Sequence, residues 1–371
     1  MAPVRAFTFL VPGDWHTPTG GFRYDRRLAE ALIAAGWAVD VRRLDGPWPE
    51  PDPATLAHAA ATVADIADGT LVLADGLAFG VLGSVVAAHA ARLRWVALVH
   101  HPLHLETGLP PALRERLLAQ ETRALSFARQ VIVTSPRTAR DVVAMGVPPP
   151  CIAVVEPGID AASTSVAARR GPSPPAGARA TAAATAHGAR LLCVATLTPR
   201  KGHALLLQAL AGLPELRWEL HCVGSLTRDP TTAAQLQALT SEPPLAGRVT
   251  WHGEVDDAAL HGHYSAADLV VLASLHEGYG MAVAEALAAG RPVLASDAGA
   301  LAQTVPPQAG WCVPAGDVLA LRAALQALIC DTALRQRLAA GAREAGARLP
   351  SWPTQAKRVG AVLAAVMAFP P

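Results

Sequence analysis

The chain is poor in aromatic and in charged residues, and both shortages limit what it can do. Among its 371 residues, 5% are aromatic and 16% are charged, whereas 51% are hydrophobic. Such a composition is typical of a folded, well-buried protein and excludes a disordered one. The 31 basic residues are almost balanced by 30 acidic ones, so no global excess of positive charge indicates a nucleic-acid partner.

Cysteine is also scarce, and the five that are present form no CxxC pair. Two of them, Cys193 and Cys222, lie within apolar runs that are typical of strands. We therefore expect reduced, mostly buried thiols, as in a cytoplasmic protein. The 13 histidines are scattered without HExxH or a similar ligand spacing, so the sequence predicts no metal site.

Long apolar runs are missing as well. The short apolar stretch Val4–Val11 is typical of a first strand rather than of a signal peptide. Arg92 and Arg94 interrupt the run that comes nearest to membrane-spanning length. The sequence thus predicts a cytoplasmic protein without a membrane span, and it leaves peripheral contact with a membrane open.

The first half of the chain alternates short apolar runs with longer amphipathic ones. A helix is expected over Arg23–Ala35, with Gly36 as its C-terminal cap. The alternation predicts βαβ units and a parallel sheet. The expected strands are Val4–Val11, Trp37–Leu44, Leu71–Ala74, Trp95–His100, Gln130–Thr134 and Ile152–Val155.

Residues 169–189 break this pattern, because they are rich in Pro, Gly, Ala and Thr and have no apolar periodicity. We interpret them as an interdomain linker, with a long surface loop as the alternative. The alternation then resumes, and the chain length favours two domains. The expected strands are Leu191–Ala195, Trp218–Val223, Val249–His252, Leu269–Ala273 and Pro292–Ala295, and the expected helices are Leu205–Leu210, Ala258–Ala266, Met281–Ala289 and Gln355–Ala368.

The most informative stretch is His276–Gly290, directly after an apolar strand. Its glycines allow a tight turn close to a ligand. A helix that starts near Met281 would present free N–H groups and a positive dipole end to an anion such as a diphosphate. Glu277 before the helix and Glu285 along it could bind vicinal hydroxyls. Either glutamate alone could be a solvated surface residue, but the combination favours a binding site.

A second stretch, Cys193–Gly202, has a strand that leads into a loop and then a helix. Arg200 and Lys201 lie at the start of that helix. Two cations there can stabilise the negative charge of a bound anion. The alternative, two solvated surface cations, suits Arg200 better than Lys201.

Three weaker signals follow other strands. Gly20 and Gly21 lie in a loop that lacks the GxGxxG pattern of dinucleotide-binding proteins. His100 ends a strand on the side where open parallel sheets bind ligands, and it could form a hydrogen bond with a ligand or accept a proton. Its alternative role is structural. Gly224 and Val255 lie after later strands. They could contact a ligand or form plain turns.

These residues resemble family 4 of the glycosyltransferases. Glu277 and Glu285 occupy the glutamate positions of the family's E-x7-E signature, and Gly290–Val293 continues the match. Cys193–Gly202 resembles the family's strand–loop–Lys-Gly segment, in which the lysine neutralises the donor diphosphate. There are two departures: Thr196 stands near the place of a common arginine, and Gly299-Ala300 stands where a pair of glycines is usual.

The resemblance implies a GT-B architecture, an α/β fold of two Rossmann-like domains with parallel sheets facing across a cleft. It implies an acceptor-binding domain over residues 1–168, completed by a returning C-terminal helix within 352–371. The linker 169–189 would precede a nucleotide-sugar-binding domain over residues 190–351. The resemblance is dense in the second half of the chain and thin in the first.

The family pattern also implies roles for individual residues. Glu285 is expected at the donor ribose, Glu277 at the transferred sugar, and the backbone near Val255 at the nucleotide base. Catalytic roles are implied for His100, Arg200, Lys201 and Glu277. Donor contacts are implied for Gly20, Gly21, Gly224, Val255, Gly278, Tyr279, Gly280, Met281 and Glu285.

The implied activity is retaining transfer of a sugar from a nucleotide-diphosphate donor, of UDP-sugar or GDP-mannose type, without metal or cofactor. The leaving diphosphate would help to accept the proton of an unidentified hydroxyl acceptor, which could be a small molecule, a glycan or a lipid-linked molecule. The alternatives are another GT-B enzyme, such as a nucleotide-sugar epimerase or a phosphorylase, and a non-catalytic scaffold. A nucleotide-dependent oxidoreductase is disfavoured by the missing glycine pattern.

Overall fold

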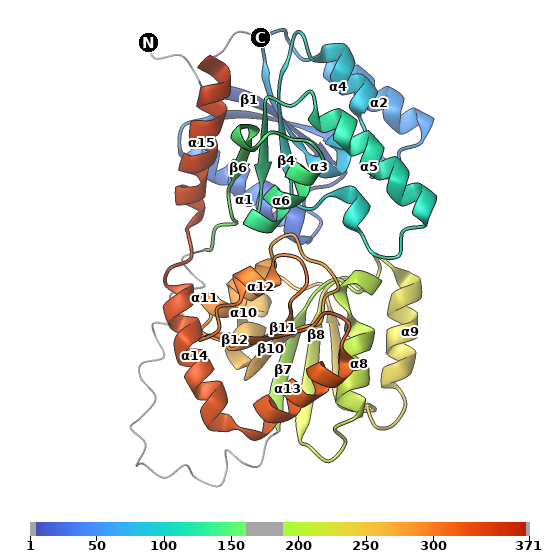
Figure 1. Cartoon of the computed structure of the whole chain (residues 1–371), viewed down its shortest axis with the longest axis vertical. Helices are drawn as coiled ribbons and strands as arrows, with labels where there is room; N and C mark the ends of the chain where they lie inside the picture. Colours follow the sequence, from blue (N-terminus) through green and yellow to red (C-terminus); the bar gives the residue numbers. More distant parts are fainter. Residues whose placement is uncertain (1–4, 161–187, 369–371) are drawn as a thin grey trace. The chain divides into compact units, whose positions relative to one another are not determined.

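The computed structural model describes residues 5–160 and 188–368, which fall into two compact units. Unit 1 comprises Met1–Gly158 and Pro350–Pro371, and unit 2 comprises Ile159–Leu349. Each unit is an α/β fold built on one six-stranded sheet (Figure 1). The predicted linker 169–189 lies, up to residue 187, outside the described residues.

In unit 1 all strand pairs are parallel, and the order is β2-β1-β3-β4-β5-β6. Strand β2 therefore lies on one side of β1, and β3 to β6 follow in sequence order on its other side. The strands are β1 (Ala6–Pro12), β2 (Ala38–Leu44), β3 (Leu71–Asp75), β4 (Arg94–Val99), β5 (Gln130–Val133) and β6 (Ile152–Val154). The helices are α1 (Gly20–Ala34), α2 (Pro53–Ala64), α3 (Gly76–Phe79), α4 (Gly83–His89), α5 (Pro111–Leu125), α6 (Pro136–Ala144) and α15 (Trp352–Ala368).

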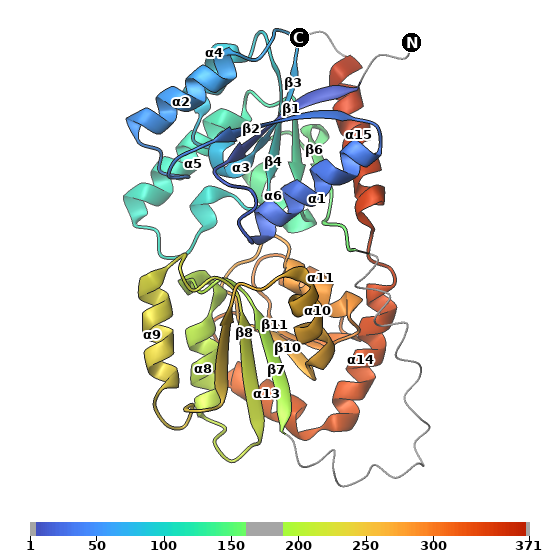
Figure 2. The ribbon, with the colours of Figure 1, turned by 180° about the vertical axis from the view of Figure 1, so that it is seen from behind.

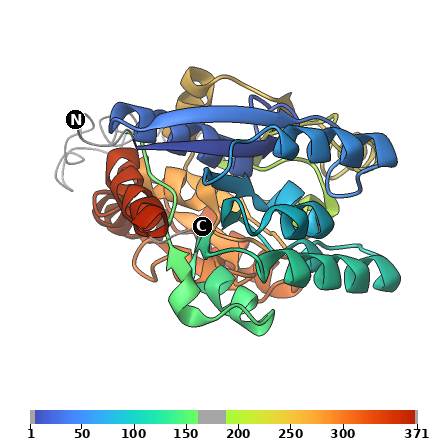
Figure 3. The ribbon, with the colours of Figure 1, turned by 90° about the horizontal axis from the view of Figure 1, so that it is seen from above.

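Helices cover both faces of this sheet. The core that contains Ala59, Ala124 and Val142 joins α2, α5 and α6 to one face. The C-terminal helix α15 packs against α1 and lies on the opposite side of the sheet from α5 (Figures 1 and 3). Gln355 in α15 donates to the carbonyl oxygen of Glu156 at 2.5 Å, and so fixes the helix to the end of the unit's own sheet.

Unit 2 repeats this plan with the order β12-β11-β10-β7-β8-β9, again with parallel pairs (Figure 2). One core joins α8, α9 and α13 to one face, and another joins α10 and α11 to the other. The strands are β7 (Ala189–Val194), β8 (Trp218–Val223), β9 (Val249–Gly253), β10 (Leu269–Leu272), β11 (Val293–Ser296) and β12 (Gly310–Val313). The helices are α8 (His203–Ala211), α9 (Pro230–Thr240), α10 (Asp257–Ala266), α11 (Met281–Ala288), α12 (Leu301–Thr304), α13 (Val318–Cys330) and α14 (Thr332–Gly346).

The strands and helices expected from the sequence are present, with ends that differ by a few residues. Helix α1 begins before Arg23, because the hydroxyl of Thr19 accepts the N–H of Phe22 and caps the helix there. The short strand β12 and the helices α9, α12, α13 and α14 were not predicted. Within the described part of the chain, every helix is too short or too polar to cross a lipid bilayer.

Candidate active site

The strand order of unit 2 reverses between β7 and β10, and in open parallel sheets ligands bind at such a switch point. The 3-10 turn Pro199–Lys201 follows β7, and the loop with Glu277 follows β10. Because both strands are parallel and adjacent, their carboxyl ends carry these two loops to one place. Topology thus brings together two motifs that are separated by two further strands in the sequence.

Glu277 is the centre of a buried charge cluster. Its Oε1 accepts from Lys201 Nζ at 2.6 Å and from Ser274 Oγ at 2.8 Å. Its Oε2 lies 3.5 Å from a guanidinium nitrogen of Arg200. Arg200 also donates to the carbonyl oxygen of His276 at 2.8 Å, so it holds the same loop by its backbone.

The two cations determine the ionisation of this glutamate. Burial alone would raise the pKa of Glu277, but the charges of Lys201 and Arg200 lower it to about 2. The carboxylate is therefore ionised at neutral pH. Since two cations meet one carboxylate, the cluster keeps an excess of positive charge, which is what a diphosphate requires.

Two glycines allow the loops to approach each other. Gly202 has φ +68°, and a Cβ there would collide with the carbonyl oxygen of Ala273 at the end of β10. Gly299 has φ +61°, and a Cβ there would collide with the backbone of Glu277. The N–H of Ala300 donates to the carbonyl oxygen of Glu277 at 2.9 Å. The loop 297–300 thus packs against the backbone of Glu277, and the one glycine Gly299 allows this close approach.

Helix α11 begins next to this cluster. Gly280 precedes its first turn with φ +93°, and a helix start of this kind leaves N–H groups available to an anion. The predicted donor residues Gly278, Tyr279 and Met281 belong to this turn. The Tyr279 side chain packs in a small core with Ile159 and Ala284, so only its backbone faces the turn.

Glu285 and Val255 both lie next to α10. Glu285 Oε2 accepts from the hydroxyl of Tyr264 at 2.8 Å, which fixes the carboxylate to α10. Val255 lies in the turn between β9 and α10, half-buried against the same core. The N–H of Gly224, after β8, donates to the carbonyl oxygen of Gly253 at 2.9 Å. Gly224 therefore lies beside the end of β9, two residues before Val255 in the chain.

Unit 1 has its own charge cluster at its own switch point. His100, directly after β4, places Nε2 2.8 Å from Asp25 Oδ1 and 3.3 Å from Asp75 Oδ2. Asp75 ends β3, and Asp25 lies in the helix that follows β1. A Cβ at Gly21 would lie 3.4 Å from the His100 ring, so this glycine lets α1 lie close to the imidazole. Its neighbour Gly20 is the first residue of α1.

The carboxylates keep this histidine charged. Burial would lower the pKa of His100, but the charges and hydrogen bonds of Asp25 and Asp75 raise it to about 10. Burial, and then the charge of Asp75, raise the pKa of Asp25 to about 8. Among the groups that raise the pKa of His100, the charge of Asp25 comes first, so the imidazolium and the ionised Asp25 stabilise each other. An imidazolium can donate a hydrogen bond but cannot accept a proton.

Sequence reasoning missed Asp25, Asp75, Ser274 and Tyr264. A signal was present for two of them. Asp25 stands in phase with the buried residues Phe22 and Leu28 of α1, where an acidic side chain needs a partner. Asp75 follows a fully buried strand that neighbours the strand of His100. Ser274 and Tyr264 carried no such signal.

One hollow in the described residues lies away from these clusters. It measures about 770 Å³ and lies between β12 and α14 of unit 2, with Trp311 and Arg337 in its lining. Its lining includes none of the predicted site residues. We therefore place the candidate active site by the charge clusters and the strand topology.

Comparison with known proteins identifies both halves of the chain. Residues 18–163 match the model described as Glycosyltransferase Family 4, and residues 183–345 match that described as Glycosyl transferases group 1. The D-inositol 3-phosphate glycosyltransferase of Xylanimonas cellulosilytica is 32% identical over 275 residues, which are 69% of this chain and 63% of that protein. The match thus spans less than two thirds of that relative's length.

Two solved structures have the same fold. The sucrose-phosphate synthase of Thermosynechococcus elongatus superposes with a TM-score of 0.79 at 25% identity, covering 98% of this chain and 99% of that one. The Anabaena protein HepE, solved with UDP and glucose, gives a TM-score of 0.75 at 19% identity, covering 97% and 100%. The second likeness concerns the fold alone.

Proposed function

The chain belongs to family 4 of the glycosyltransferases, and from that premise we propose that it transfers a sugar from a nucleotide-diphosphate donor to a hydroxyl acceptor. The donor is of the UDP-sugar or GDP-mannose type. Transfer retains the anomeric configuration and uses neither metal nor cofactor. The observation that carries the proposal is the cluster of Lys201, Arg200 and Glu277 at the switch point of unit 2.

In this proposal Lys201 is the main diphosphate ligand. When the sugar–phosphate bond breaks, negative charge grows on the leaving diphosphate, and a cation fixed in advance stabilises that charge without reorganisation. Glu277 holds the Lys201 ammonium at 2.6 Å and so aims it before the donor arrives. Arg200 is fixed to the His276 carbonyl oxygen and therefore contributes less directly to stabilising the diphosphate.

Three further roles complete the donor site. The N-terminus of α11 binds phosphate oxygens through backbone N–H groups. Glu285, fixed by Tyr264, binds the ribose hydroxyls. The turn that contains Val255 meets the base, and Gly224 lies beside that turn.

His100 has a different role from that of a general base. Because its pKa is raised to about 10, it is an imidazolium at neutral pH and donates a hydrogen bond to a sugar or acceptor hydroxyl. The proton of the acceptor then passes to the leaving diphosphate. The acceptor panel should include D-inositol 3-phosphate, since a relative is named for it.

The test is a panel of UDP-, GDP- and ADP-sugars, each assayed for thermal stabilisation, hydrolysis and transfer. A ligand that binds only the folded chain must raise its melting temperature by mass action, so one nucleotide class should stand out. Glu285→Gln should abolish much of that shift for the bare nucleoside diphosphate. An unchanged melting temperature with every donor, and no turnover, would leave only a non-catalytic scaffold.

A further inference from the structure

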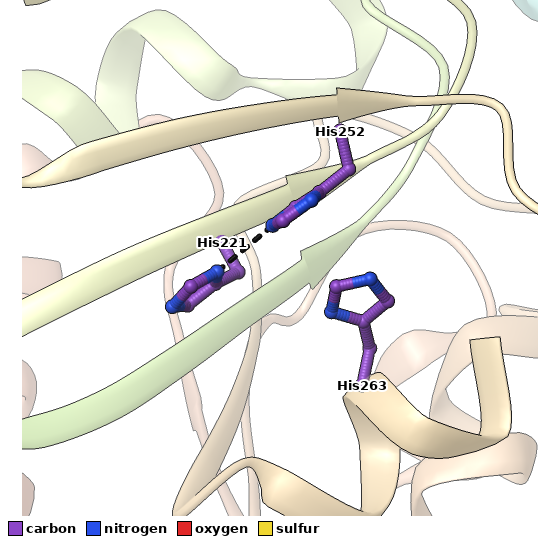
Figure 4. A group of neighbouring side chains, drawn as sticks. All are labelled: His221, His252 and His263. Carbon is purple, nitrogen blue, oxygen red and sulfur yellow. Dashed lines mark hydrogen bonds between the residues drawn. The ribbon is translucent and has the colours of Figure 1, made fainter. Parts of the chain in front are cut away.

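Three histidines that are far apart in the sequence lie together on one face of unit 2 (Figure 4). His221 comes from β8, His252 from the edge strand β9, and His263 from α10. The sequence offers no metal-binding spacing among them, because β-pairing and helix packing create the group. All three side chains are half-buried.

The ring nitrogens of the three residues face one another. His221 Nδ1 and His252 Nε2 are 2.9 Å apart, and the His252 and His263 ring centroids are 4.3 Å apart. One nitrogen from each residue lies within 4.8 Å of the other two. Around a tetrahedral Zn²⁺ with Zn–N bonds of about 2.0–2.1 Å, nitrogens lie ~3.3–3.4 Å apart, so small side-chain rotations close the site.

A carboxylate lies behind one histidine, near enough to accept its second N–H after a small rotation. Glu219 Oε1 lies 3.3 Å from His221 Nε2, the nitrogen that faces away from His252. Histidines that bind metals commonly donate their second N–H to a carboxylate, which fixes the tautomer and orients the ring. Glu219 also lies 3.7 Å from Arg190, so it offsets the nearby positive charge.

The chemistry of the three donors selects the ion. Neutral imidazole suits Zn²⁺, Cu²⁺ and Ni²⁺, whereas Mg²⁺ and Ca²⁺ prefer oxygen ligands.

We propose that His221, His252 and His263 bind a Zn²⁺ ion, with Glu219 as the residue that orients His221. Three protein ligands leave a fourth position for water. The ion ties the edge strand β9 to β8 and to α10, and thereby fixes the turn 254–256 between them. It stabilises unit 2 and takes no part in bond breaking.

The test is calorimetric titration of the untagged, chelator-treated chain with Zn²⁺ in the presence of a competing chelator. We expect one ion per chain and a higher melting temperature with Zn²⁺. Co²⁺ in place of Zn²⁺ should give the visible absorption of a tetrahedral, nitrogen-rich site. Absence of both stoichiometric Zn²⁺ binding and this Co²⁺ spectrum would overturn the proposal without any variant.

Variants then locate the ion. His252→Gln and His263→Gln should each weaken Zn²⁺ binding by more than the ~10–100-fold that second-shell changes cost, and Glu219→Gln should fall within that range. The matched control is His261→Gln, because His261 lies in α10 like His263 but its ring contacts the Asp257 carbonyl oxygen. This variant should bind Zn²⁺ as the wild type does. Melting without Zn²⁺ verifies that each variant folds. Zn²⁺ binding that survives both ligand changes, or that falls equally with His261→Gln, places the ion elsewhere.

Discussion

The two units share one strand plan but compensate buried charge in opposite ways. At the switch point of unit 1, between β1 and β3, two carboxylates flank one histidine. At the switch point of unit 2, between β7 and β10, two cations flank one carboxylate. The same topology thus presents two chemically different sites, and the fold alone determines neither.

The difference has a consequence for ligands. Unit 2 keeps an excess of positive charge around Glu277, so it suits a diphosphate. In unit 1 two carboxyl groups flank one imidazole, so the group carries no excess of positive charge. Such a group offers hydrogen bonds to hydroxyls rather than a site for a second anion. The sharpest way to test the comparison is to change one charge at each switch point.

The largest effect is expected at Lys201. Lys201→Ala should lower turnover by ~10²–10³-fold, as the loss of one electrostatic transition-state group does elsewhere. Arg200→Ala should cost less, because Arg200 also serves the loop through the His276 carbonyl. Steady-state rates with the donor chosen by the panel would measure both. If neither change affects turnover, unit 2 does not bind the diphosphate here.

A matched variant separates chemistry from stability at this position. Lys201→Ala leaves Glu277 buried with less compensation, which could unfold the loop and lower turnover indirectly. The double change Lys201→Ala with Glu277→Gln removes that buried charge. If turnover returns with the double change, the loss in the single variant came from the loop and not from the missing cation.

The second effect is expected at Asp75 in unit 1. Asp75→Asn should lower the pKa of His100 from about 10 and destabilise the chain by ~1–3 kcal/mol at neutral pH. The pKa is read from imidazole NMR shifts during a pH titration. The raised pKa adds stability in full below the ordinary value of 6.5, and this is lost as the pH rises through 10. In the variant the loss should begin at lower pH; an unmoved His100 pKa would contradict the pairing.

These two sites also differ in how far the sequence could predict them. The fold was predictable because apolar runs alternate with amphipathic ones throughout the chain. Lys201 and Glu277 lie in two contiguous motifs, each a strand, a glycine turn and a helix start, so local pattern was enough to single them out. What the sequence did not predict is that Glu277 binds Lys201 directly, since that contact depends on β7 and β10 being neighbours.

Unit 1 was harder, because its site is assembled from three separate elements. His100 was identifiable at a strand end, but its charge depends on Asp25 and Asp75, which no local motif marks. The histidine cluster of unit 2 is an extreme case. His221, His252 and His263 come from two strands and a helix, and only the strand order brings them within reach of one another.

A smaller effect concerns acid stability. The pKa of Glu277 is lowered from 4.5 to about 2. The ionised carboxylate therefore stabilises the folded chain in full above pH 4.5, and this stabilisation is lost as the pH falls to 2. Wild-type unfolding free energy should therefore fall across this window by ~1.4 kcal/mol per pH unit more steeply than that of Glu277→Gln. Denaturant melts at several pH values would measure the difference. Equal slopes would mean that Lys201 and Arg200 do not lower the pKa of Glu277.

The smallest effect is expected from removing metal, and it distinguishes the two clusters of unit 2. Turnover in our proposal depends on Lys201 and the leaving diphosphate, so a chelator should leave the rate at saturating donor unchanged. The same chelator should lower the melting temperature, because Zn²⁺ binds only the folded arrangement of His221, His252 and His263. The His252→Gln variant should lose this change in melting temperature and keep the wild-type rate. If the chelator instead abolishes turnover in the wild type and Mg²⁺ or Mn²⁺ restores it, metal-independent transfer is wrong; if Zn²⁺ alone restores it, the histidine site takes part in catalysis.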